Sequence, residues 1–285
     1  MNIDPKEVFG REAHHYHARR LEYADADIDR IINETKLMPG TMIADIGAGS
    51  GILGRKFLEK GMQVVFVEPN RNMRDQCAVN LKATSIAPNR YKIIDGIASA
   101  SGLEARSLDL ITIGDALHWF EPASAATKEF RRILKPEGKM VSIRRLPDAQ
   151  NLFIQALNSF LINHAEAYSK GQRFIKVSGN SANLPLLENA QRFFSPDFVT
   201  YSRKIPVQYS IDQFMDYLRT VSSIADYISD DDNKTEMKKF LQSQVNEHGV
   251  IAFDWEVRVC IGTPRKYKTV DISNEVTQLS KVRGS

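Results

Sequence analysis

Short apolar runs alternate with amphipathic stretches between residues 41 and 145. Five runs have the length and apolar content of buried strands, namely 41–46, 63–67, 91–94, 108–113 and 139–143. The stretches that place apolar residues at helical spacing are 52–60, 70–83 and 123–134. Near-continuous apolar strands separated by helices are typical of a parallel sheet with helices on both faces. The pattern therefore predicts an α/β fold, with residues 135–138 as the turn before the last of these strands.

The pattern changes on both sides of this unit. Residues 7–35 are polar and predict two helices that are broken near Glu22. After residue 145, the expected helices are 151–168, 211–228 and 234–246, and the expected strands are 198–209 and 253–261. We therefore predict one mainly parallel sheet of seven strands, with a helical cap inserted after the fifth strand. The predicted units are an N-terminal helical lid (1–36), an α/β core (37–145), an inserted cap (146–250), a returning strand of the core (251–268) and a flexible tail (269–285).

The composition is typical of a globular protein in a reducing compartment. The 285 residues carry a formal charge of +3 and are 42% hydrophobic, and no apolar run approaches the roughly 18 residues that a membrane span needs. The first residues are polar and acidic, unlike a secretory leader. Cys77 and Cys260 are far apart in the sequence and cannot form a zinc site by themselves. We expect a cytoplasmic protein that does not associate with membranes, and the small positive charge mildly favours an anionic substrate.

A glycine cluster lies between the first predicted strand and the helix that follows it. Asp45 lies near the end of the strand, and Gly47, Gly49 and Gly51 follow at alternate positions. Glycine lets the backbone approach a ligand closely, and a helix N-terminus favours negative charge. Glu68 ends the next strand, where a carboxylate can accept hydrogen bonds from ribose hydroxyls. The combination predicts a cofactor that contains a ribose, and the alternative is a tight turn followed by a solvated carboxylate.

Two kinds of cofactor fit this loop. Residues 49–54 also match the G-x-G-x-x-G fingerprint of dinucleotide-binding proteins. However, the carboxylate of Asp45 would repel a pyrophosphate and would attract a cationic group. The sequence also lacks the Tyr-x-x-x-Lys pair of short-chain dehydrogenases. The charge therefore favours S-adenosylmethionine, whose amino group and sulfonium are positive, over NAD.

These and further sequence blocks resemble a known family. Residues 41–145 resemble class I S-adenosylmethionine-dependent methyltransferases, in the small-molecule subgroup with a His-Trp after the fourth strand to which trans-aconitate methyltransferase-like enzymes belong. The blocks that carry the resemblance are 45–51, 67–70 with Met73, 96–99, 108–110, 115–120 and 130–138. Tyr16, Arg20 and Tyr23 are similar to a segment that folds over the cofactor in such enzymes. The resemblance implies a Rossmann-like class I methyltransferase fold with S-adenosyl-L-methionine as its cofactor.

The resemblance also implies roles for single residues. The glycine loop would surround the methionine half of the cofactor, with Asp45 supporting the loop, while Asp115 would lie beside the methionine amino group. Glu68 would take the ribose hydroxyls, and Pro69, Asn70 and Met73 would flank the adenine. The residues implied in cofactor binding are Tyr16, Arg20, Asp45, Gly47, Ala48, Gly49, Gly51, Glu68, Pro69, Asn70, Met73, Ile97, Ala98 and Asp115.

One position departs from the family pattern. The backbone of Ala98 is implied to contact the adenine ring, and the preceding position often carries an acidic side chain that binds the exocyclic amine. Here that position is Ile97. The contact to the amine is therefore either shifted to Ser99 or lost.

Candidate substrate and catalytic residues follow the fourth and fifth strands. His118 is a candidate general base, because the end of a parallel strand faces the ligand crevice and imidazole titrates near neutral pH. The alternative is that it bonds a backbone group or merely lines the pocket. Trp119 could line the acceptor site or pack in the core. Arg144 or Arg145 could pair with an acidic substrate, or could simply face solvent. Tyr217 lies in a stretch that matches the family only loosely and is a candidate substrate contact.

The predicted function is methyl transfer to a small molecule. Methyl transfer from a sulfonium is an in-line displacement that needs alignment more than a protein nucleophile, and the acceptor atom could be oxygen, nitrogen or carbon, including in secondary metabolism. No metal is expected, because His14 and His17 more simply form a polar helix face than a metal site. The expected partner is the small-molecule acceptor, with no nucleic acid and no membrane, in a monomer or homodimer. The alternatives are a methyltransferase that acts on macromolecules and a non-catalytic protein that binds S-adenosylmethionine.

Overall fold

One mixed sheet runs through the part of the protein that the structure describes. The structure is a computed structural model, and it describes residues 22–165, 190–219 and 221–267. Within these residues the strand order is β3-β2-β1-β4-β5-β7-β6. The strands are β1 (Met42–Ile46), β2 (Gln63–Val67), β3 (Tyr91–Ile94), β4 (Leu108–Gly114), β5 (Leu134–Pro147), β6 (Val199–Tyr209) and β7 (Ile251–Gly262). The five neighbouring strands β3, β2, β1, β4 and β5 pair in parallel, whereas β7 is antiparallel to both β5 and β6. The predicted α/β fold with a mainly parallel seven-stranded sheet is therefore confirmed.

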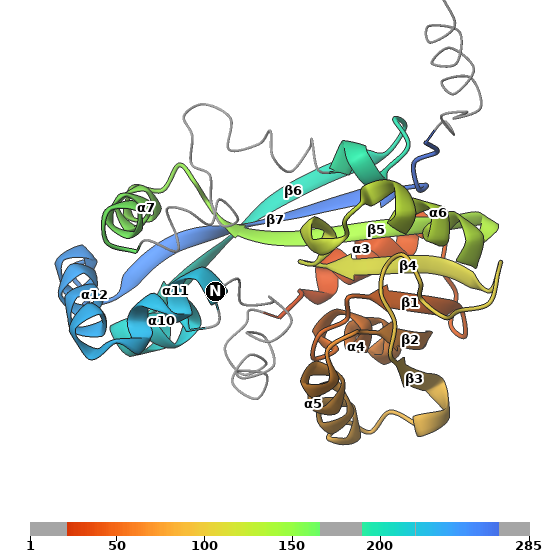
Figure 1. Ribbon diagram of the computed structural model, residues 1–285, viewed down its shortest axis with the longest axis horizontal. Coiled ribbons are helices and arrows are strands. Elements are labelled where there is room, and N and C mark those ends of the chain that lie inside the picture. Colours follow the sequence, from red (N-terminus) through yellow and green to blue (C-terminus); the bar gives the residue numbers. More distant parts are fainter. Residues whose placement is uncertain (1–21, 166–189, 220, 268–285) are drawn as a thin grey trace, which may run out of the picture.

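Helices cover both faces of the parallel part of the sheet (Figure 1). On one face, α3 (Asp25–Thr35), α4 (Ile52–Glu59) and α5 (Arg71–Lys82) contribute to a single apolar core with β1, β2 and β7. On the other face, α6 (Ala123–Ile133) buries Phe130 and Ile133 beside β4. Two short 3-10 helices, η1 (Pro88–Arg90) and η2 (Leu117–Trp119), lie between these elements along the chain. This arrangement leaves the carboxyl ends of the parallel strands as the edge at which loops gather.

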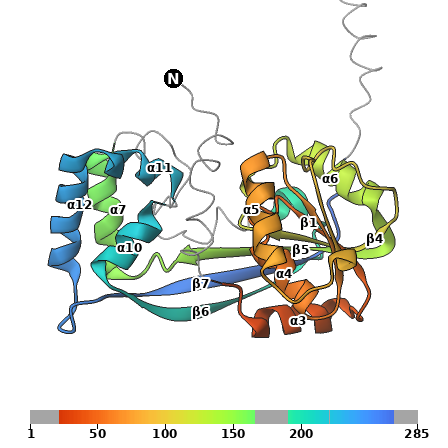
Figure 2. The ribbon, with the colours of Figure 1, turned by 90° about the horizontal axis from the view of Figure 1, so that it is seen from below.

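The three strands at the antiparallel end also carry a second group of helices. These are α7 (Leu152–His164), α10 (Ile211–Leu218), α11 (Ser222–Ala225), η3 (Tyr227–Ser229) and α12 (Asp231–Gln244), here called the cap helices. Figure 2 shows them at one end of β6 and β7, away from α4 and α6. They enclose an aromatic core in which the ring of Phe153 lies 5.3 Å from Phe214 and 5.8 Å from Phe253. The residues predicted as a cap therefore form helices with their own core and also supply β6 to the sheet.

Several boundaries differ from the sequence prediction. Residues 135–138, predicted as a turn, belong to β5, because pairing with β4 already begins at Leu134 and continues through a shift of register between Leu108 and Leu110. The predicted helix 211–228 is broken after Leu218, where β-branched and hydroxyl residues favour continuation of a helix only weakly. The first predicted N-terminal helix, the end of helix 151–168 and the tail 269–285 lie outside the described residues. The boundaries of the five predicted units stay predictions.

Candidate functional site

A cavity of about 450 Å³ lies where the carboxyl ends of β1, β2 and β4 meet. The predicted residues that line it are Gly47, Gly49, Glu68, Pro69, Asn70, Met73, Ile97, Ala98, Asp115 and Trp119. A smaller cavity of about 50 Å³ adjoins it, since both are lined by Gly47, Gly49 and Asp115. The smaller cavity is also lined by Asp45, Ala48, Tyr23 and Arg145. The structure therefore brings most of the predicted cofactor residues together in two connected spaces.

The glycine loop is built so that no side chain intrudes on this region. Gly47 has φ +69°, and a Cβ atom added to it would lie 2.9 Å from the Cβ of Ala116. Gly51 has φ +82°, and its added Cβ would lie 2.6 Å from the Sγ of Cys77. Both positions need a residue without a side chain, for conformational and for steric reasons. Gly51 lines neither cavity, so it contributes to the shape of the loop that begins α4.

Asp45 fastens the loop from beneath. Its Oδ2 accepts a hydrogen bond of 2.9 Å from the amide of Gly54, and its Oδ1 accepts one of 3.3 Å from the Thr112 hydroxyl. Burial raises the pKa of Asp45 to about 7, although both hydrogen bonds oppose this rise. The carboxyl is therefore partly protonated near neutral pH. A cationic group in the smaller cavity would favour its ionised form.

Glu68 connects the loop to the end of β2. Its Oε2 accepts a hydrogen bond of 2.9 Å from the backbone amide of Gly49, and its Oε1 accepts one of 2.9 Å from the backbone amide of Asn70. Burial raises the pKa of Glu68, and the two amide donors and the charge of Arg74 oppose the rise. Arg74 in turn donates 2.8 Å hydrogen bonds to the carbonyls of Glu68 and Pro69 and forms a 3.1 Å ion pair with Asp95. Each carboxylate oxygen of Glu68 keeps acceptor capacity for a further donor in the larger cavity.

Asp115 and the buried Arg145 form a partly buried ion pair beside the two cavities. Asp115 has φ +53°, a strained value for a residue with a side chain. Its carboxylate accepts from the backbone amide of Arg145 at 2.8 Å, from its Nε at 2.9 Å and from its Nη2 at 2.6 Å. The Tyr23 hydroxyl donates to the same carboxylate at 3.3 Å, and the Arg145 guanidinium lies 4.0 Å from the Tyr23 ring centre. These contacts hold the strained residue in place at the edge of both cavities.

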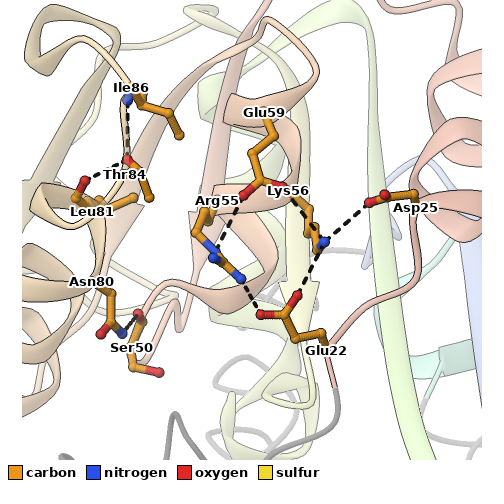
Figure 3. Close-up of polar contacts among 10 residues, drawn as sticks. All are labelled: Glu22, Asp25, Ser50, Arg55, Lys56, Glu59, Asn80, Leu81, Thr84 and Ile86. Atoms are coloured by element: carbon orange, nitrogen blue, oxygen red, sulfur yellow. Dashed lines mark hydrogen bonds and ion pairs between the residues drawn. The ribbon is translucent and has the colours of Figure 1, made fainter.

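Surface ion pairs hold the segment before α3 against α4 (Figure 3). The guanidinium of Arg55 pairs with Glu22, and the Lys56 ammonium lies 3.3 Å from Glu22 and 3.2 Å from Asp25. On the opposite side of the glycine loop, an amide of Asn80 on α5 donates to the Ser50 carbonyl at 2.9 Å. The Asn80 contact thus fastens the glycine loop to α5, and the ion pairs fasten Glu22 and Asp25, on either side of Tyr23, to α4.

The central part of the chain is similar to a known domain. Residues 44–142 match the family model described as a methyltransferase domain. This segment holds the glycine loop, Glu68, Asp115 and the surrounding strands. The predicted methyltransferase domain is therefore confirmed, whereas its assignment to the trans-aconitate methyltransferase-like subgroup is not part of what the match supports.

Curated relatives share this domain over part of their length. An uncharacterized methyltransferase of Mycobacterium tuberculosis is 27% identical over 153 residues, which cover 54% of this chain and 58% of the relative. One of Geobacillus kaustophilus is 30% identical over 124 residues, which cover 42% of this chain and 55% of the relative. The chain thus spans little more than half the length of these relatives.

Solved structures share the fold over most of the described chain. A putative type II methyltransferase from Anaeromyxobacter dehalogenans matches with a TM-score of 0.59 at 18% identity, covering 86% of this chain and 97% of that one. The YcgJ protein from Bacillus subtilis matches with a TM-score of 0.54 at 15% identity, covering 84% and 99%. At these identities the likeness establishes the fold, which is that of class I methyltransferases.

The predicted substrate and catalytic residues of this methyltransferase domain and its surroundings are more scattered. Trp119 lines the larger cavity, and the ring of His118 lies 4.9 Å from its ring, but His118 is not among the lining residues. Arg144 lines neither cavity; its neighbour Arg145 does. Tyr217 is buried in the core of the cap helices, with its ring 5.4 Å from that of Trp255. The roles of these residues in catalysis and substrate binding stay predictions.

Other predicted residues lie outside what the structure describes. Tyr16, Arg20 and the histidine pair His14 and His17 belong to residues 1–21. Among the residues that are described, no group of three His, Cys, Asp or Glu side chains is arranged to hold a metal ion. No helix in the same residues is long and apolar enough to cross a membrane.

Sequence reasoning did not foresee two of the contributors. Arg74 follows Glu68 by six positions, and only the helix that starts at Arg71 turns its side chain back toward the strand end. The pairing of Arg145 with Asp115 joins the ends of β4 and β5. The signal available was a charged residue at the end of each neighbouring strand, but it did not distinguish Arg145 from Arg144.

Proposed function

We propose that this protein transfers a methyl group from S-adenosylmethionine to a small-molecule acceptor. The observation that carries the proposal is the charge pattern of the smaller cavity. The smaller cavity is lined by two acidic side chains, Asp45 and Asp115, and by one basic side chain, Arg145. An amino-acid zwitterion carries both complementary charges, whereas a pyrophosphate would meet two acidic side chains. This pattern favours the methionine half of S-adenosylmethionine over the diphosphate of a dinucleotide.

The remaining lining residues fit the nucleoside half of the same cofactor. Glu68 would accept hydrogen bonds from the ribose hydroxyls, and Met73 and Ile97 would lie against the adenine. Gly47 and Gly51, where an added Cβ atom would crowd its neighbours, keep side chains out of the loop. When bound, the cofactor supplies an electrophilic methyl group on a sulfonium. The chain's own contribution is to orient it and to exclude water from the cavity.

The acceptor side is supported by the loop after β4. Trp119 provides an apolar wall of the larger cavity, and His118 lies on the same turn as a candidate base for an acceptor that must lose a proton. The cap helices, carried on β5 to β7, would enclose a small acceptor. An acceptor of this size needs no extended basic face, and the formal charge of the chain is only +3.

Calorimetry with two ligands tests the cofactor. We expect S-adenosylhomocysteine to bind the protein with one-to-one stoichiometry and NAD to bind far more weakly. Tighter binding of NAD would overturn the choice of cofactor. Glu68→Ala tests the nucleoside half of the site, because it should weaken S-adenosylhomocysteine binding without abolishing the fold.

Turnover tests the reaction. Conversion of S-adenosylmethionine to S-adenosylhomocysteine is followed with pools of small acceptors, with mixed tRNA and with protein extract. Turnover that requires the small acceptors is expected, with His118→Ala reducing turnover and leaving cofactor affinity nearly unchanged. Turnover with a macromolecule alone would favour the first alternative. Tight cofactor binding without turnover in any pool would favour a non-catalytic cofactor-binding protein.

A further inference from the structure

Arg144 is a half-buried cation to which the described residues offer no bonded counter-ion. It lies on β5, one residue past the point where the Asp115 amide donates to the Ile143 carbonyl at 2.9 Å. Within residues 22–165, 190–219 and 221–267, no hydrogen bond or ion pair joins the Arg144 guanidinium to another side chain or to the backbone. Burial lowers the pKa of Arg144, and Asp115 acts against that effect. A partly desolvated charge of this kind is costly unless something pairs with it.

The acidic groups around Arg144 are already engaged. The Asp115 carboxylate is bonded to the amide, Nε and Nη2 of Arg145. On β7, Arg258 stands directly opposite Arg144 in the antiparallel pairing. The carboxylate of Glu256 accepts hydrogen bonds from Nε and Nη2 of Arg258, at 2.8 and 2.9 Å. Arg144 and Arg258 are therefore cross-strand neighbours on β5 and β7, and Arg258 already occupies the carboxylate of Glu256, so among the described residues the charge of Arg144 stays in excess.

Strand geometry places this excess charge on the acceptor side of the sheet. Residues alternate between faces along a strand, and Ile143 and Arg145 lie on the face that holds Tyr23 and α4. Arg144 therefore lies on the opposite face, the one covered by α6 and by the loop that contains Trp119. Asp115, which directly follows β4 and donates its amide to the Ile143 carbonyl, lines both cavities. The cation thus stands beside the end of the cofactor site but not inside it.

We propose that Arg144, with Arg258 opposite it, binds an oxyanion of the acceptor molecule, a carboxylate or a phosphate. A guanidinium presents a fork of donors that matches either group, and the ligand would supply the counter-charge that the described residues do not give Arg144. That the anion belongs to the methyl acceptor rests on the proposed function. The anion site itself does not, because it depends only on the contacts around Arg144.

The experiment measures thermal unfolding of the full chain with and without simple anions. In the absence of ligand, Arg144→Met should raise the melting temperature by about 2 °C or more, because it removes an uncompensated charge and keeps a chain of similar length. Sodium malonate or inorganic phosphate should raise the melting temperature of the unmodified protein above that in sodium chloride of equal ionic strength. Arg144→Met should lose this gain, and Arg144→Lys should keep only part of it. Arg131→Gln, an exposed cation on α6, is the control for net charge and should keep the full gain.

A gain in melting temperature with either malonate or phosphate supports the proposal, and the larger of the two gains distinguishes a carboxylate site from a phosphate site. A lower melting temperature for Arg144→Met in the absence of anions would mean that the side chain has a structural partner, and the proposal would fail. Equal gains from malonate, phosphate and chloride, or an undiminished gain in both Arg144→Met and Arg144→Lys, would overturn it as well. If Arg144→Met does not fold, the gain in melting temperature of Arg144→Lys, compared with that of Arg131→Gln, still tests the proposal. Calorimetry with S-adenosylhomocysteine on the same samples tests the proposed function separately, so the two can fail independently.

Discussion

The buried carboxyl of Asp45 should make the stability of the protein depend on pH in a defined direction. Its pKa rises from an ordinary value of 3.8 to about 7, because burial disfavours the charged form. The folded state therefore binds the proton more tightly than the unfolded state. The stabilising effect of the proton is complete below pH 3.8 and is lost as the pH rises through 7. A pKa change of this size corresponds to about 4 kcal/mol of unfolding free energy as an upper order of magnitude.

Asp45→Asn removes this titration and keeps an oxygen that can accept from the Gly54 amide. The free energy of unfolding of both proteins, without cofactor, is measured by urea denaturation at several pH values between 4 and 8.5. Other titrating groups are common to both, so their effects cancel in the difference. We expect Asp45→Asn to gain stability relative to the unmodified protein as the pH rises from 4 to 7, with a plateau above 7. A difference that stays constant over this range would refute the buried-carboxyl reasoning.

The same carboxyl should report on the cofactor. A cationic amino group placed in the smaller cavity favours ionised Asp45, so S-adenosylhomocysteine binding near pH 7 should release protons. Calorimetry in two buffers with different ionisation enthalpies measures this release. It should be reduced in Asp45→Asn. Equal proton release by the two proteins would mean that Asp45 does not sense the bound ligand.

Other predictions follow from single contacts. Glu68→Ala should weaken S-adenosylhomocysteine binding by about 1–3 kcal/mol, roughly 5- to 150-fold in Kd by calorimetry, because charge-assisted hydrogen bonds are lost; unchanged affinity would exclude the ribose role. Arg74→Ala should also weaken binding, and adding it to Glu68→Ala should cost little more, since Arg74 acts by holding the backbone of Glu68; fully additive losses would contradict this. Gly51→Ala should lower the melting temperature more than Gly102→Ala. Both positions have positive φ, but only the Cβ atom added at Gly51 would crowd the Sγ of Cys77, at 2.6 Å. Equal losses would mean that the thiol moves aside.

The parallel part of the fold and the cofactor loop could be predicted because local signals there agree. Apolar runs of four to six residues match the observed strands β1 to β4 closely, and each is bounded by glycine or polar residues. Glu68 and Asp115 end two of these strands, and parallel strands bring their carboxyl ends to the same edge. Position along the chain was therefore enough to bring these residues together.

Features that depend on contacts between distant segments could not be predicted in the same way. The raised pKa of Asp45 arises from burial beneath a loop. From the sequence alone, Asp45 counted simply as a negative charge. The apolar residues on both sides of the break in the helix expected over 211–228 pack into a core shared with α7 and β7. Tyr217 joins that core, and no local pattern distinguishes a buried aromatic residue from a residue that lines a pocket.

Arg144 and Arg145 show most clearly what decides a functional assignment at the end of a strand. The two are identical in chemistry and adjacent in sequence, yet alternation along β5 sends them to opposite faces of the sheet. Pairing of Gly114 with Ile143 sets the register, and this register brings Arg145 to the carboxylate of Asp115. Arg145 thus neutralises the acid on the cofactor side, and Arg144 keeps its charge on the other side, opposite Arg258. A shift of β5 by one residue would exchange these positions. Because cofactor and acceptor must approach the same strand ends from different directions, a pair of adjacent cations divided between the two faces can serve both, and the sequence alone cannot say which cation serves which.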